Sequence, residues 1–145
     1  MSTEADPIVE ILNAYQSAVH AKDLQAFAAL YAPGIHVFDM WGSWSISGLS
    51  AWAGETEGWF TSLGSERVVV GIDDVASFRS ERLAFGHATL TYTAVSAESQ
   101  ALRSLQNRLS IALVRSESGW QIVHQHTSAP VDFTTMKPQL RRSPA

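Results

Sequence analysis

The sequence predicts an α+β domain in which three N-terminal helices pack on a curved, mostly antiparallel sheet. Three observations support this prediction. Before residue 64, apolar residues recur at spacings of three and four, which is the period of a helix face. After residue 64, long segments rich in Val, Ile, Thr and aromatic residues are separated by short turn signals. The chain has 145 residues, 46% of them hydrophobic, which suits one domain with a buried core.

Capping residues support the first two helices. Asp6 and Pro7 suit the N-cap and the first position of a helix that ends near Ala21. Asp23 begins a second, shorter helix in the same way. We expect the Pro-Gly pair at 33–34 to end that second helix, because proline and glycine do not continue a helix.

The rest of the domain is predicted from its pattern alone. Residues 35–46 predict a short hairpin or an irregular strand pair. Residues 49–63 predict a third helix, although two glycines within it each cost up to about 1 kcal/mol relative to alanine. Short connections then predict antiparallel neighbours among four long strands. We expect these strands at 66–78, 83–95, 102–115 and 120–131.

The composition excludes several classes of protein. Without cysteine the chain has no disulfides and no finger-type zinc site, and a net charge of −4 argues against a nucleic-acid partner. No run of about 18 apolar residues predicts a membrane span, and the N-terminus lacks a secretion signal, so we expect a cytoplasmic location and no membrane partner. We predict one domain over residues 1–133 and a mobile tail over 134–145.

Asp39 and Tyr15 are the first candidate catalytic residues. Large apolar residues flank Asp39 on both sides, a setting that raises the pKa of a carboxyl and suits a general base or acid. The alternative is a turn aspartate that caps the hairpin. Tyr15 lies on the apolar face of the first helix, where its hydroxyl needs a partner if it is buried.

The last strand carries two more candidates, His124 and His126. Strand alternation places them on one face together with Trp120, Ile122 and Ser128, and we interpret this face as the interior of the domain. The alternative is that both are surface or hydrogen-bonded core histidines. The two could also chelate a metal, but nothing in the spacing selects a third ligand, so we predict no metal site.

Two further polar residues lie on strands whose inward face the pattern does not decide. His87 shares a face with Phe85 on the strand at 83–95. Arg108, on the next strand, would need an acidic partner or an anionic ligand if it pointed inward, and would be an ordinary solvated charge if it pointed outward.

The closing segment Trp-Gln-Ile-Val-His-Gln-His-Thr-Ser at 120–128, with the Tyr15, Asp23 and Asp39 spacing, resembles the nuclear transport factor 2-like (NTF2-like) superfamily. The resemblance is strongest to SnoaL-like and ketosteroid-isomerase-like proteins and covers about residues 6–133. The association domain of calcium/calmodulin-dependent kinase II ends in a similar segment.

This resemblance implies a cone-shaped fold with a pocket between helices and sheet, and a homodimer through the outer sheet face. It also implies an oxyanion donor at Tyr15, a proton-shuttling base at Asp39, and inward-pointing side chains at His87, His124, His126 and Ser128. The second, protonated aspartate of ketosteroid isomerases has no counterpart in residues 108–114, so steroid isomerisation itself is not expected.

The predicted function is therefore a small-molecule enzyme of the isomerase or cyclase type that needs no cofactor. The alternative is a non-catalytic ligand-binding or oligomerisation module. Four tryptophans between residues 41 and 59 predict an aromatic wall beside Asp39, suited to a flat or apolar ligand. The predicted catalytic residues are Asp39, Tyr15, His124 and His126. The predicted ligand-binding residues are Trp41, Trp52, Trp59, Phe60, His87, Arg108 and Ser128.

Overall fold

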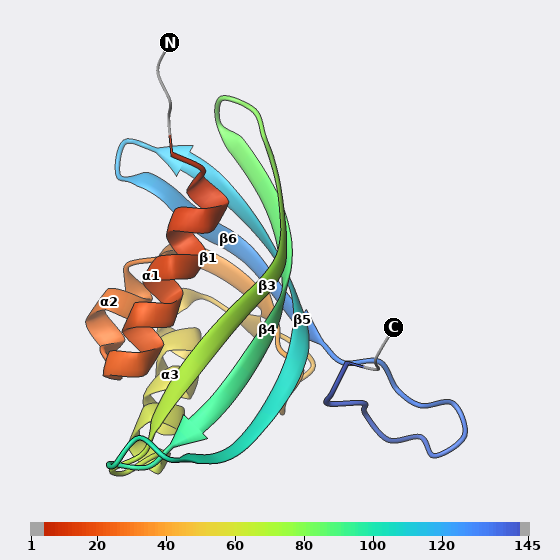
Figure 1. Ribbon diagram of the computed structural model, residues 1–145. Coiled ribbons are helices and arrows are strands. Elements are labelled where there is room, and N and C mark those ends of the chain that lie inside the picture. Colours follow the sequence, from red (N-terminus) through yellow and green to blue (C-terminus); the bar gives the residue numbers. More distant parts are fainter. Residues whose placement is uncertain (1–4, 143–145) are drawn as a thin grey trace.

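The structure, a computed structural model, describes residues 5–142. The first four residues of the predicted domain and the last three of the predicted tail lie outside these residues. Three helices cover the concave face of a curved sheet that does not close into a barrel (Figure 1). They are α1 (Pro7–Ala21), α2 (Leu24–Ala28) and α3 (Leu49–Ser62). The predicted α+β class and the cone-shaped arrangement are confirmed.

Six strands form the sheet, in the order β2-β1-β6-β5-β4-β3. The long strands pair as antiparallel neighbours, as predicted, whereas β1 and β6 run parallel. This parallel pair places the strand that follows the first two helices beside the last strand of the domain. The strands are β1 (Tyr31–Phe38), β2 (Ile46–Ser47), β3 (Arg67–Arg79), β4 (Leu83–Val95), β5 (Ala101–Ser116) and β6 (Gly119–Ser128).

Helix α1 begins and ends as its sequence predicts. The carboxylate of Asp6 accepts a hydrogen bond from the backbone N–H of Ile8 at 2.9 Å, and Lys22 closes the helix in the left-handed conformation. The apolar face of the helix is buried against the sheet. Because this face includes Tyr15, the helix directs a phenol into the interior of the domain.

Helix α2 is shorter than predicted. It ends at Ala28, and the Pro-Gly pair at 33–34 lies inside β1 instead of ending the helix. The register between β1 and β6 shifts at this pair, so the sheet absorbs the proline in an irregular stretch. The chain joins the sheet early because Tyr31 is buried and donates a hydrogen bond to the side chain of Gln125 at 2.8 Å.

The C-terminal segment follows a defined path as far as residue 142. It leaves the sheet after β6, forms a bridge between Val131 and Pro138, and returns to the exposed half of β5 (Figure 1). There, the backbone N–H of Gln106 donates to the carbonyl of Leu140 at 2.7 Å. The described part of the predicted mobile tail is thus hydrogen-bonded to the domain.

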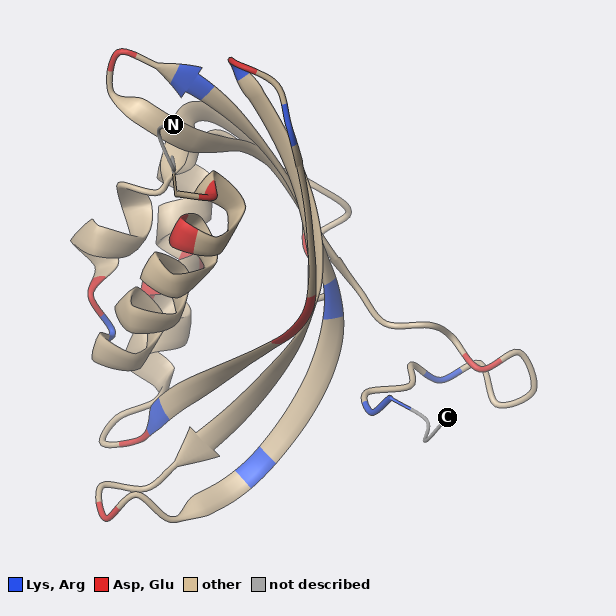
Figure 2. Ribbon diagram, turned by 45° about the horizontal axis from the view of Figure 1, so that its top comes forward, with Lys and Arg blue, Asp and Glu red and all other residues tan. Residues whose placement is uncertain are grey.

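Charged residues are sparse on the sheet. Figure 2 shows Lys, Arg, Asp and Glu mainly at hairpin ends, on the helices and in the C-terminal segment, with no continuous basic stripe along the drawn residues. Among the described helices, none is both long and apolar enough to cross a membrane.

Candidate functional site

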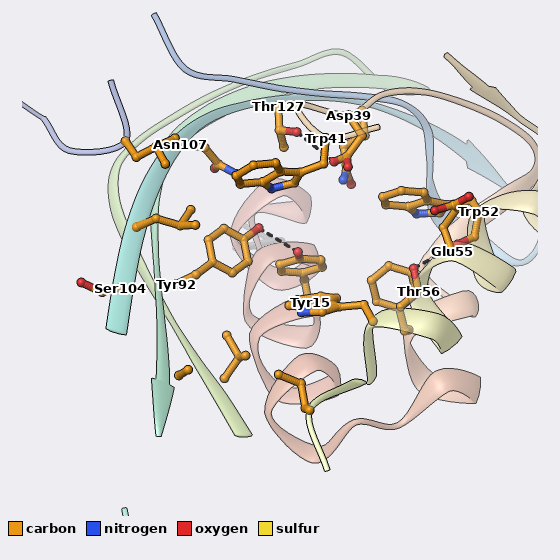
Figure 3. A pocket seen from close by; sticks show the side chains of 18 of the residues that line it. Tyr15, Asp39, Trp41, Trp52, Glu55, Thr56, Tyr92, Ser104, Asn107 and Thr127 are labelled. Atoms are coloured by element: carbon orange, nitrogen blue, oxygen red, sulfur yellow. Dashed lines mark hydrogen bonds between the residues drawn. The ribbon is translucent and has the colours of Figure 1, made fainter. Parts of the chain in front are cut away.

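A cavity of about 520 Å³ lies between the helices and the concave face of the sheet. Its size is typical of pockets that hold small molecules. Aromatic side chains form most of its wall, and a few polar groups converge on it (Figure 3). The aromatic lining residues are Tyr15, Phe27, Trp41, Trp52, Trp59 and Tyr92, and polar ones include Asp39, Glu55, Thr56, Asn107, Gln125 and Thr127.

Asp39 stands at the end of β1, where strand alternation turns its side chain into the cavity. Its carboxylate accepts a hydrogen bond from the hydroxyl of Thr127 at 3.0 Å, and that hydroxyl accepts one from the backbone N–H of Met40. Burial raises the pKa of the Asp39 carboxyl; the hydrogen bond from Thr127 opposes that rise, and the charge of Glu55 adds to it. The carboxylate is therefore held in place but poorly solvated.

Two tyrosines face each other across the cavity. The hydroxyl groups of Tyr15, from α1, and Tyr92, from β4, are 2.8 Å apart and share a hydrogen bond. Burial raises the pKa of Tyr15 well above its usual value and that of Tyr92 to about 12, so both stay protonated at neutral pH. Since one proton joins the two oxygens, the pair keeps one hydroxyl proton for a ligand.

The predicted aromatic wall is present in part. Trp41, Trp52 and Trp59 line the cavity, and the ring of Trp59 meets that of Tyr92 edge-on at 6.2 Å. Trp44 is 95% exposed and contributes nothing to the wall. Phe60 lies behind the wall in the core, against Phe27, and does not line the cavity.

The inward orientation predicted for His124 and His126 is wrong. Opposite β6, Leu113 of β5 pairs with Ile122 and the next residue, Ala112, pairs with His124, so Val123 is an extra residue in a β-bulge. The bulge reverses the alternation within β6. After it, Gln125 and Thr127 point inward, 4% and 5% exposed, and the histidines point outward.

The other polar residues predicted to line the pocket are also on the convex face. His87 pairs through Ser110 with His126 across the sheet, and Arg108 donates to the hydroxyl of Ser128 at 3.2 Å. The family resemblance implied an inward orientation for His87 and Ser128, which is wrong, and the alternatives that the sequence left open for Arg108 are resolved outward. The structure therefore brings Asp39 and Tyr15 together with three tryptophans and separates them from the other predicted polar residues.

The convex face carries a surface that we call the outer patch. It is defined by three exposed phenylalanines and four histidines: Phe38, Phe78, Phe85, His36, His87, His124 and His126. One row crosses five strands, because Phe78, Phe85, Ala112, His124 and His36 are successive pairing partners. The rings also contact one another, with Phe38 at 5.0 Å from His124 and 5.4 Å from His126 between ring centroids.

Sequence reasoning missed several polar residues of the cavity, among them Tyr92, Asn107, Gln125 and Thr127. The first two had a usable signal. Tyr92 alternates in phase with Ala88 and Leu90, and Asn107 with Leu109 and Ile111, and the apolar phase of a strand is normally the buried one. The inward positions of Gln125 and Thr127 depend on the bulge in β6, for which the sequence has no clear signal.

No group of three His, Asp or Glu side chains is placed to hold a metal ion within residues 5–142. The chemistry available in the cavity is that of a poorly solvated carboxylate, a phenol pair and a primary amide. Such groups can move protons and donate hydrogen bonds.

Comparison with known proteins identifies the family. A SnoaL-like domain model matches residues 8–132, and the chain belongs to this family, within the NTF2-like superfamily. Among curated proteins, no sequence matches the chain.

Several solved structures share the fold. An NTF2-like protein of unknown function from Pseudomonas putida KT2440 is 24% identical, with a TM-score of 0.83 and 99% of both chains covered. An NTF2-like superfamily protein from Salmonella enterica is 22% identical, with a TM-score of 0.71, 91% of this chain and 94% of that chain. A protein assigned to the calcium/calmodulin dependent protein kinase II association domains, from Xanthomonas campestris, is 17% identical, with a TM-score of 0.70 and 89% of each chain. At these identities the similarity shows the fold alone.

Proposed function

We propose that this protein binds a flat, mostly apolar carbonyl compound in the cavity and isomerises it by proton transfer, without a cofactor. One observation carries the proposal: a carboxylate with a raised pKa and a hydrogen-bonded phenol pair line the same aromatic cavity. A base of this kind is more reactive than a solvated carboxylate, since burial disfavours its charge.

In the proposed reaction, Asp39 removes a proton from a carbon next to the carbonyl group. The electrons of the broken C–H bond delocalise toward the carbonyl group of the ligand, and the carbonyl oxygen gains negative charge. The free proton of the Tyr15–Tyr92 pair stabilises that oxygen. Asp39 then returns the proton to a different carbon, so that the atoms balance and no redox step occurs.

Exchange of carbon-bound protons tests the base. We expect the protein to accelerate the exchange of the acidic C–H protons of 2-tetralone in D₂O, a reaction followed by NMR. Asp39→Asn should slow this exchange about 100-fold or more, because a positioned general base contributes roughly 10²- to 10⁴-fold.

The matched control is Asp23→Asn. Asp23 caps α2 through its carboxylate, and asparagine caps a helix about as well as aspartate, so this variant should keep both its fold and its exchange activity. If the Asp39 and Asp23 variants exchanged protons at the same rate as the unchanged protein, Asp39 would not be the base.

A second candidate function is assembly, and the outer patch favours it. Phe78 is 60% exposed and Phe85 46%, on the convex face of the sheet. Large exposed apolar patches mark interaction sites. We propose that two copies of the chain pack through this face as a homodimer, an arrangement that leaves both cavities free. The predicted cytoplasmic location stays a prediction.

A further inference from the structure

Asn107 is a buried polar residue that the proposed proton transfer does not use. It lies on β5, is 7% exposed, and directs its amide into the cavity beside Trp41 (Figure 3). Its Nδ2 group donates to the sulfur of Met40 at 3.4 Å, and sulfur is a weak acceptor. Its Oδ1 atom is shielded from water and has no hydrogen-bond partner among the described residues.

An unpartnered buried oxygen is unusual, because native proteins satisfy nearly all buried polar atoms. In the described part of the chain, one other buried side-chain atom lacks a hydrogen-bond partner, Nε1 of Trp52. That group has a polar neighbour: burial raises the pKa of Tyr31, and the Trp52 indole opposes the rise. Asn107 Oδ1 is therefore the acceptor in this cavity that has no partner within residues 5–142.

The position of Asn107 defines the missing partner. Its amide also acts on the Tyr92 hydroxyl, where it opposes the rise in pKa that burial causes. Asn107, Tyr15 and Tyr92 line the same cavity, and Asn107 lies on the Tyr92 side of it (Figure 3), so the pair offers a proton and Oδ1 a lone pair to the same ligand. A single hydroxyl group on a ligand satisfies both, whereas a ketone oxygen satisfies only the phenol pair.

We infer that the pocket selects planar ring compounds that carry a hydroxyl group, such as a phenol or the enol form of a ring ketone. In this inference, Oδ1 of Asn107 accepts a hydrogen bond from the hydroxyl group of the ligand. This inference rests on the proposed function, since an enol is the protonated form of the enolate that the proposed reaction generates. Because Oδ1 is shielded, the inference requires the Trp41 indole, which lies beside Asn107 (Figure 3) and is 53% exposed, to move aside when a ligand binds.

Two probes that differ by one substitution, a methyl group in place of the hydroxyl proton, test the inference: 2-naphthol and its methyl ether, 2-methoxynaphthalene. In both compounds, the oxygen attached to the ring can accept a hydrogen bond. By isothermal titration calorimetry, we expect the protein to bind the naphthol about tenfold more tightly or better, because the ether leaves Oδ1 unpaired. In Asn107→Leu this preference should fall to about one, with little loss of affinity for the ether.

Thr56→Val is the matched control. Thr56 also lines the cavity and is buried, but its hydroxyl already donates to the carbonyl of Trp52 at 3.0 Å. Its removal should leave the preference for the naphthol intact. Thermal unfolding checks that each variant folds. Asn107→Ala replaces Asn107→Leu if leucine does not fit, and the preference of the unchanged protein is a test in itself.

Equal affinity for the two probes in the unchanged protein, or a preference that survives in the Asn107 variants, would overturn the inference. Failure of both probes to bind would overturn it and also count against an aromatic-ligand pocket. A naphthol preference without exchange of 2-tetralone protons would leave the inference standing and refute the proton transfer. The two proposals can therefore fail separately.

Discussion

Asp39 is the residue at which the chemistry of the cavity and the stability of the fold oppose each other. Its environment raises the pKa of the carboxyl, and burial is the main cause. The folded protein therefore binds this proton more tightly than the unfolded chain does. It follows that the ionised carboxylate needed for catalysis lowers the free energy of unfolding.

This conflict gives a prediction for stability. The contribution of Asp39 is most favourable below about pH 4, the pKa of an unfolded aspartate, and is lost as the pH rises through the raised folded-state pKa. Asp39→Asn removes the charge, and its side-chain oxygen still accepts from Thr127. We expect this variant to have a higher midpoint of thermal unfolding than the unchanged protein at neutral pH.

The difference between the two proteins should vanish in acid, where the carboxyl is protonated in both the folded and the unfolded state. Thermal scans across the pH range measure it. A variant that is less stable than the unchanged protein at neutral pH would mean that the hydrogen bonds to the carboxylate outweigh the cost of burying it.

Helix α1 approaches strand β4 closely at one point, Gly86. Gly86 on β4 leaves room for Ile8, a residue in the first turn of α1 that is fully buried. A Cβ atom added at Gly86 would lie 2.5 Å from Cγ2 of Ile8 and 2.9 Å from the carbonyl oxygen of Ala76 on β3. The second contact is to backbone, which cannot turn away as a side chain can.

We therefore expect Gly86→Ala to destabilise the protein by about 1–3 kcal/mol, the usual cost of overpacking, as measured by urea unfolding. Gly58→Ala is the control, because Gly58 lies in α3 with nothing within 4 Å of an added Cβ. Alanine there should raise stability by up to about 1 kcal/mol. If both variants unfolded at the same urea concentration, the tight contact between α1 and β4 would not limit the packing.

The bulge in β6 decides which residues of that strand reach the cavity. A period of two sorts the residues of a regular strand into two faces, but one extra residue exchanges the faces partway along. The apolar start of β6 correctly identifies Ile122 as buried. The same phase, continued past Val123, assigns the histidines to the interior and Thr127 to the surface, both of which are wrong.

At the scale of the whole molecule, the sheet has two faces of different use. The concave face holds the cavity, and the outer patch covers the convex face with side chains that would pack against a flat surface. We expect the protein to sediment as a dimer in analytical ultracentrifugation at micromolar concentration. Phe85→Glu should convert it to a monomer, because a charge would be buried without a partner in the interface.

Val9→Glu is the control for that experiment. Val9 is also an exposed apolar residue, 40% accessible, but it lies on α1 on the opposite side of the sheet. This variant should remain dimeric. A monomeric unchanged protein, or a dimer that survives Phe85→Glu, would argue against assembly through the outer patch.

The sequence by itself determined the order of the elements, the ends of α1, the presence of α3 and the candidates Asp39 and Tyr15. These features depend on local rules: capping residues, helical periodicity, and the position of a residue at the end of a strand. The closing segment of β6 added the family resemblance, which the match over residues 8–132 confirms.

Only the tertiary structure decided what surrounds Asp39. The pairing of Tyr15 with Tyr92, the hydrogen bond from Thr127 to Asp39 and the contact of the Asn107 amide with Met40 join residues that are 67 to 88 positions apart in the chain. Such contacts depend on strand register, and a single extra residue in β6 changed the register there. The sequence encodes that register through the packing of the whole sheet, and so no local pattern shows it.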